Sequence, residues 1–245
     1  SWGVFQDVLC LGKETTFTFV QDVLDEIMDI FPSKVIHIGG DEAPTVAWEQ
    51  CPLCQKKMKE EGVDAKHFQG YFTNRIEKYL NSKGHSIMGW DEIMDGDINT
   101  SAMVHCWRNP SFGIKAAQKG HDVVLSPTKY CYFDFYQANP RAVHEPLAIG
   151  GYLPVDSVYN MDTMPKDISP ENRKHIIGIQ ANLWTEYVAV PNHAEYMLLP
   201  RMAALAENAW VKDRGPYSAF LPRLTRLKSL YDVYNLHYAN HVWKK

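Results

Sequence analysis

The stretch Lys34-Val35-Ile36-His37-Ile38-Gly39-Gly40-Asp41-Glu42 decides the fold. A β-branched run that stops at two glycines predicts a short buried strand, and the strand delivers two adjacent acids. At the carboxyl end of a parallel strand such acids lie at the floor of a cleft, where α/β enzymes keep their chemistry. Because two neighbouring charges disfavour joint ionisation, one acid can donate a proton while the other stays charged. The alternative is a solvated turn that leads into a helix.

Similar strands recur along the chain and alternate with helices. Alternation of this kind indicates parallel strands joined by crossover helices, which is an α/β fold. Because acidic or aromatic residues follow the strands, we expect the functional residues on one face, as in a (β/α)8 TIM barrel. We expect residues 1–245 to form part of one catalytic barrel domain, roughly strands four to eight, with the first three strands upstream of Ser1. The five predicted strands are residues 35–38, 86–89, 102–106, 122–126 and 176–181.

The helices between these strands follow from caps and helical spacing. Thr15 or Thr16 is expected to cap a helix that stops at Pro32, and Asp64 a helix closed by Gly84. Residues 128–170 show no periodic element and predict a long functional loop. Two last helices are expected, one over residues 193–210 with a kink at Pro200 and one over residues 218–235.

Composition narrows the possible classes of function. The chain has 245 residues, 45% of them hydrophobic, which suits one sizeable core. A net charge of -4 without charge runs gives no basis for nucleic-acid binding. No stretch approaches 18 consecutive apolar residues, so we expect no membrane insertion of this segment. The chain begins without Met or a signal-like stretch, so its start is expected to be internal to a longer protein.

Five cysteines occur, and two of them form Cys51-Pro52-Leu53-Cys54. This spacing is that of a redox pair or of half a zinc site, but no second pair or histidine cluster completes a zinc site in the sequence. A loop clasp or two free thiols is therefore favoured over a metal site. We expect no metal and no cofactor.

The strand ends carry a set of acids and aromatic rings. Aromatic faces stack on the apolar side of a pyranose, and carboxylates bind its hydroxyls. A single Trp is more often a core residue, but agreement among four strand ends favours a sugar site. The candidates are Asp41, Glu42, Trp90, Trp107, Tyr132, Asp134, Trp184 and Glu186.

The string His37-Ile38-Gly39-Gly40-Asp41-Glu42 resembles the signature of the glycoside hydrolase family 20 β-N-acetylhexosaminidases. The resemblance runs from Trp2 to Glu207. A competing match, Gly39-Gly40-Asp41-Glu42 as the core of cyclic-dinucleotide synthases, fails because those enzymes place it in a β-hairpin turn, whereas Ala43-Pro44 follows here. Three shorter strings support family 20: Gly89-Trp90-Asp91-Glu92, Tyr132-Phe133-Asp134 and Trp184-Thr185-Glu186.

The resemblance implies an exo-acting, retaining enzyme that removes terminal β-linked GlcNAc or GalNAc through an oxazolinium intermediate. Glu42 would be the general acid and base, and Asp41 would hold the substrate's acetamido group, which is the nucleophile. Tyr132 would bind the acetamido oxygen, and His37 would support the site from behind. The three Trp residues would wall the acetyl pocket, and Asp134 with Glu186 would bind hydroxyls.

The implied partners are N-acetylhexosamine-containing glycans or chitooligosaccharides, and the implied location is the periplasm, the cell surface or the medium. The alternative function is a non-catalytic N-acetylhexosamine-binding module on a degenerate or truncated barrel. The intact Asp41-Glu42 pair counts against that alternative.

Overall fold

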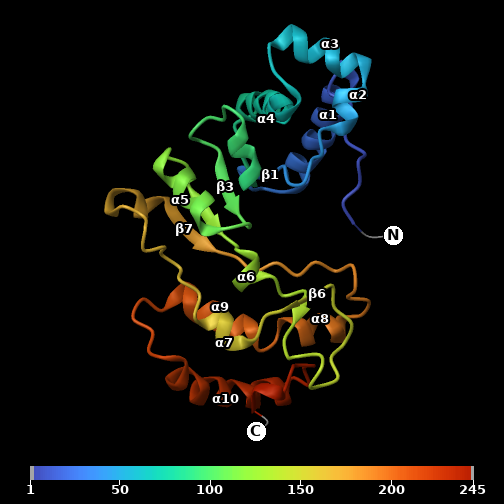
Figure 1. Cartoon of the computed structure of the whole chain (residues 1–245). Coiled ribbons are helices and arrows are strands. Elements are labelled where there is room, and N and C mark those ends of the chain that lie inside the picture. The colour runs from blue at the N-terminus through green and yellow to red at the C-terminus, as the bar shows by residue number, and fades with distance from the viewer. Residues whose placement is uncertain (1–2, 244–245) are drawn as a thin grey trace. The chain divides into compact units, whose positions relative to one another are not determined.

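The computed structural model describes residues 3–243, so Ser1 and Trp2, where the resemblance begins, lie outside the described residues. Five strands form one sheet in the order β1-β2-β3-β4-β7. The pairs β1·β2 and β2·β3 are parallel, with Ile36 opposite Ile87 and Gly89 opposite Val104. The predicted α/β alternation is confirmed (Figure 1). The strands are β1 (Val35–His37), β2 (Ser86–Trp90), β3 (Met103–Cys106), β4 (Val123–Leu125) and β7 (Ile176–Ile179).

The chain divides into two compact units. The first holds the residues up to Cys106 together with Ser111–Val124 and Ser169–Ile177. The second holds Trp107–Pro110, Leu125–Ile168 and the residues from Gly178 on.

Helices of the first unit begin and end near the predicted residues. Asp64 caps α4 as predicted, because its Oδ1 accepts the backbone N–H of His67 at 3.0 Å. The expected cap of α1 at Thr15 or Thr16 is wrong: α1 begins at Glu14, and the Thr16 hydroxyl instead donates to the Cys10 carbonyl. The elements are α1 (Glu14–Ile30), α2 (Val46–Gln50), α3 (Pro52–Glu61), α4 (Ala65–Ser82), η1 (Asp91–Asp95), α5 (Pro110–Gln118) and η2 (Pro170–His175).

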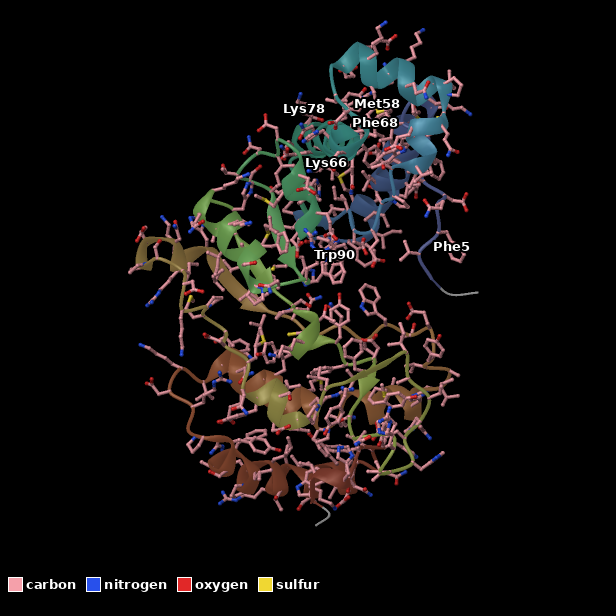
Figure 2. All side chains as sticks on the ribbon, viewed as in Figure 1. Phe5, Met58, Lys66, Phe68, Lys78 and Trp90 are labelled. Atoms are coloured by element: carbon pink, nitrogen blue, oxygen red, sulfur yellow. The ribbon has the colours of Figure 1, made fainter. Side chains whose placement is uncertain are left out.

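One core cluster of the first unit joins α2, α3 and α4. Figure 2 shows Met58 and Phe68 close together where α3 meets α4. Trp48 packs edge-on against Phe68, with ring centroids 5.6 Å apart, and its indole N–H donates to the Leu9 carbonyl at 2.9 Å. The loop before α1 is therefore tied to the segment that follows the two acids.

The second unit corrects two sequence expectations. Residues 128–170 are not one long loop, because they contain helices and a two-stranded sheet whose elements span only two to five residues, too short for a periodic pattern. The expected helix 193–210 is two helices separated at Leu199-Pro200. The elements are α6 (Thr128–Cys131), β5 (Phe135–Tyr136), β6 (Gly150–Tyr152), α7 (Val155–Tyr159), α8 (Pro191–Leu198), α9 (Arg201–Trp210), α10 (Tyr217–Val233) and η3 (His241–Trp243).

Helices α7, α9 and α10 bury one apolar cluster in this unit (Figure 1). Val158 from α7, Ala204 from α9 and Leu224 from α10 are almost completely buried there. None of the helices within residues 3–243 combines the length and the hydropathy needed to cross a membrane.

Arg201, the first residue of α9, has no exposed surface. Its guanidinium donates to the carbonyls of Phe133, Phe135, Leu153 and Met197, and it stacks over the Phe133 ring at 4.8 Å. A buried charge is tolerated when its donors are all hydrogen-bonded. Arg201 therefore fixes the backbone on both sides of Asp134.

We expect Arg201→Met to lower the free energy of unfolding by at least about 3 kcal/mol, because it leaves four buried carbonyls short of a donor. The matched control is Arg223→Met, which removes the ion pair between the exposed Arg223 side chain and the partly buried Glu207 and should cost less than about 1 kcal/mol. Urea unfolding of both variants measures the difference. Equal losses would contradict the role given to Arg201.

Candidate active site

The backbone at the end of β1 turns sharply and stays hydrogen-bonded to β2. The Ile38 N–H donates to the Met88 carbonyl at 2.8 Å, and the Trp90 N–H donates to the Gly39 carbonyl at 2.9 Å. Gly39 and Gly40 have φ of 73° and 103°, which side chains disfavour. The two strands therefore stay paired up to the point where the acids begin.

Tight packing explains why glycine is needed at the turn. A Cβ on Gly40 would lie 2.8 Å from the Ile93 Cγ2, and the Gly40 carbonyl accepts the Gln69 amide at 2.6 Å. On the neighbouring strand, a Cβ on Gly89 would lie 2.7 Å from the same methyl group. Ile93 thus fills the space that two missing side chains leave.

Asp41 and Glu42 follow this turn, and both are exposed in the described structure. Glu42 has φ of 50°, the left-handed region that non-glycine residues rarely adopt. Conformations of this kind cost about 1 kcal/mol or more and persist where the surrounding structure imposes them. The strained residue is the acid on which the resemblance places proton transfer.

Three rings pack against one another beside the turn, with His37 edge-on to both Trp90 and His105. His37 Nε2 lies 3.3 Å from His105 Nδ1, and the Trp90 ring stacks on His105 with centroids 4.3 Å apart. The other His37 nitrogen, Nδ1, accepts the Gly39 N–H at 3.1 Å. This bond requires that Nδ1 carry no proton, so the ring is neutral with its proton on Nε2.

Burial, together with the neighbouring His37, lowers the pKa of His105 to about 4. The residue His37 is exposed overall, but its ring is partly shielded from solvent. This loss of solvation lowers the pKa of His37, and the Asp41 carboxylate opposes the effect. The imidazole pair is therefore neutral near pH 7 and acts as a hydrogen-bonded support for the turn.

The second unit gathers another group of predicted site residues. The Tyr132 ring lies 6.2 Å from Trp107 and 6.5 Å from Trp184, measured between centroids. Asn182 aligns the two segments, because its carbonyl accepts the Phe133 N–H at 2.7 Å. Burial raises the pKa of Tyr132 to about 12, so its hydroxyl remains a hydrogen-bond donor.

Asp134 is 4% exposed, and its Oδ1 has no hydrogen-bond partner within residues 3–243. Its pKa is raised to about 6, chiefly by burial and also by the nearby Glu186 carboxylate, against the lowering effects of a hydrogen bond from its own backbone and of Arg201. A buried carboxylate oxygen without a donor has the chemistry to accept a ligand hydroxyl.

The predicted site residues therefore fall into two groups. The first unit brings together His37, Asp41 and Trp90, with Glu42 next in the chain, and the second brings together Trp107, Tyr132 and Trp184, and separately Asp134 and Glu186. Three residues that hold these groups in place are not indicated by the sequence. His105 lies inside a predicted strand, Asn182 lies just beyond one, and Arg201 follows the proline that divides the expected helix 193–210.

A parallel α/β sheet with acids and aromatic rings after its strands is the arrangement in which α/β-barrel enzymes keep their active sites. The profile of "Glycosyl hydrolase family 20, catalytic domain" matches residues 1–213, and the chain belongs to this family.

Relatives agree with this assignment. The chain is 40% identical over 240 residues to the β-hexosaminidase of Porphyromonas gingivalis, covering 97% of this chain and 31% of that protein. It is 37% identical over 206 residues to the β-hexosaminidase of Vibrio furnissii, covering 82% of this chain and 33% of that protein. The chain thus spans about a third of the length of these relatives.

A solved structure is similar as well. The chain superposes on the family 20 exo-β-N-acetylglucosaminidase of Vibrio harveyi, in complex with N-acetylglucosamine, with a TM-score of 0.85 and 32% identity. The match covers 95% of this chain and 37% of that one. The predicted fold class, part of a (β/α)8 barrel, is confirmed. The hairpin required by a cyclic-dinucleotide synthase is absent at residues 35–61, where β1 pairs in parallel and helices α2 and α3 follow.

We expect His105 to make stability pH-dependent. Below pH 6.5 the His105 ring is protonated in the unfolded chain, whereas in the folded protein it stays neutral down to about pH 4. The free energy of unfolding therefore falls as the pH is lowered from 6.5 to 4. The slope contributed by His105 is at most about 1.4 kcal/mol per pH unit.

Urea unfolding at several pH values measures this slope. His105→Gln should flatten it between pH 6.5 and 4, where the wild type loses stability. His144→Gln, at an exposed position, is the control and should keep the wild-type slope. An unchanged slope in His105→Gln would show that His105 takes up its proton normally.

Proposed function

We propose that the protein carrying this chain is an exo-acting, retaining β-N-acetylhexosaminidase that removes terminal β-linked GlcNAc or GalNAc. The observation that carries the proposal is the Asp41-Glu42 pair, which follows a strained turn at the end of β1 in a family 20 domain. The similarity to a structure that holds N-acetylglucosamine supports the choice of sugar.

Glu42 acts as the general acid that protonates the glycosidic oxygen and then as the base that activates water. Its exposed side chain can reach a substrate in the cleft, and its fixed backbone limits the orientations it can take. Positioned proton transfer of this kind contributes rate factors of about 100 to 10,000.

The substrate's own acetamido oxygen attacks the anomeric carbon and forms an oxazolinium ion. Adjacency of the acids supports this route, because a protein nucleophile would have to face the acid across the scissile bond, roughly 5 Å away. The side chains of two adjacent residues hardly reach opposite sides of one glycosidic bond at that separation. Asp41 instead holds the acetamido N–H and balances the positive charge that develops.

In the second unit, Tyr132 donates its hydroxyl to the acetamido oxygen and so aligns the nucleophile. The rings of Trp107 and Trp184, which lie near Tyr132, wall the acetyl group. The family resemblance gives the same role to Trp90. Indole faces exclude water from a methyl group at little entropic cost.

Asp134 and Glu186 bind sugar hydroxyls and select the terminal, non-reducing residue. The partnerless Oδ1 of Asp134 supports this role, since a bound hydroxyl would satisfy it. The proposed substrates are N-acetylhexosamine-terminated glycans or chitin-derived oligosaccharides, and the proposed location, taken from the family resemblance, is the periplasm, the cell surface or the medium.

We expect Glu42→Gln in the full-length protein to lower kcat on an aryl β-N-acetylglucosaminide by about 100-fold or more, because the amide cannot transfer the proton. Asp41→Asn should lower it to a similar extent. Glu49→Gln, the same chemical change on the exposed face of α2, is the control and should retain the wild-type rate. Near-normal turnover in the first two variants would refute the assignment. GlcNAc binding without hydrolysis in the wild type would favour a binding module.

We also expect a GlcNAc-thiazoline to inhibit the wild-type enzyme more strongly than GlcNAc, because its fused ring mimics the oxazolinium ion. Tyr132→Phe should weaken thiazoline inhibition more than GlcNAc inhibition, since the lost hydroxyl faces the acetamido-derived ring. Inhibition constants for the two compounds measure both effects. Equal inhibition by the two compounds would argue against participation of the acetamido group.

A further inference from the structure

Three cysteine sulfurs meet in the first unit, at the core cluster that joins α2, α3 and α4. Cys10 Sγ lies 3.8 Å from Cys51 Sγ and 3.6 Å from Cys54 Sγ, and all three sulfurs lie within 4.8 Å of one another. The sequence spacing groups Cys51 with Cys54 only. The third thiol comes from a loop more than forty residues earlier in the chain.

The backbone brings this third thiol close by a contact that only glycine permits. A Cβ on Gly12, two residues after Cys10, would lie 2.4 Å from the carbonyl carbon of Leu53 and 2.7 Å from the amide of Cys54. The Cys10 loop is therefore packed directly onto the Cys51–Cys54 turn. The Thr16 hydroxyl adds a 2.7 Å hydrogen bond to the Cys10 carbonyl.

The Cys51–Cys54 turn lies at the start of a helix. Cys51 is the N-cap residue of α3, a ten-residue helix, and Cys54 lies in its first turn. The positive end of the helix dipole favours thiolates, the form that binds metals, whereas burial opposes ionisation of Cys54 and raises its pKa to about 12.

We propose that Cys10, Cys51 and Cys54 bind a thiophilic divalent cation, with zinc as the biological ion. Zinc–thiolate bonds of about 2.3 Å in a tetrahedron place two sulfurs about 3.8 Å apart, which matches the separations from Cys10. The three thiols release their protons to solvent, and three thiolates bind the ion. Cys10 and Cys51 are only half-buried, which leaves solvent access for a fourth ligand.

A disulfide accounts for the cluster less well. It requires sulfurs about 2.05 Å apart and uses two of the three cysteines, leaving the third in contact with the bridge and able to attack it. A cation uses all three sulfurs in the positions they already hold.

The site would clamp the loop before α1 onto the segment that follows the acids. The Trp48 indole already donates to the Leu9 carbonyl between these two segments. Metal binding should therefore raise the thermal stability of the protein without contact with the proposed substrate.

The test uses the full-length protein, purified without chelator, and its Cys10→Ser and Cys51→Ser variants, with Cys131→Ala as the control. Cys131 is buried against Met161, away from the cluster in the chain. We expect each serine variant to hold one equivalent less zinc than the wild type by elemental analysis, and Cys131→Ala to hold as much as the wild type.

Cobalt binding gives a second readout that does not depend on the variants folding. Co²⁺ added to metal-depleted wild-type protein should produce the near-ultraviolet charge-transfer band of a thiolate complex, and zinc should displace it and raise the melting temperature. Absence of this band, or an increase of two titratable thiols per chain when reductant is added, would overturn the proposal, the second result by showing a disulfide.

Discussion

The structure of this family 20 chain depends on the turn of two glycines that ends β1. The Gly39 carbonyl closes the ladder to Trp90, Gln69 holds the Gly40 carbonyl, and Ile93 fills the space where side chains would stand. The turn lets two strands run together to their last residue and then releases the chain abruptly. The backbone geometry of this turn thus determines where Asp41 and Glu42 lie.

Neutral rings support this turn better than charged ones would. His37 accepts a backbone N–H from Gly39 and meets the buried His105, which stacks on Trp90. A proton on Nδ1 of His37 would break the bond to Gly39, and a charge on His105 would lose solvation. In the second unit the buried charge of Arg201 supports the backbone in a similar way, because four carbonyls accept hydrogen bonds from its guanidinium.

Much of this could be predicted from the sequence, because the decisive signals are local. The β-branched run before Gly39, the aromatic and acidic residues after the strands and the Asp64 cap all act over a few residues. Tertiary contacts could not be predicted: nothing near Arg201 indicates the distant carbonyls it binds, and nothing near Cys10 indicates Cys51 and Cys54. The helices and strands within residues 128–170 are too short to show a periodic hydrophobic pattern, and packing fixes them.

The most direct measurement is the kcat of full-length Gly40→Ala beside Gly84→Ala. Both positions have positive φ, 103° and 78°, so both variants carry backbone strain, but only the Cβ at position 40 collides with Ile93. We expect Gly40→Ala to lose about 10-fold or more in kcat on an aryl β-N-acetylglucosaminide, because displacement of the turn by about 1 Å misplaces both acids. Gly84→Ala should keep the wild-type kcat. Equal kcat values for the two variants would contradict the view that this turn positions the acids.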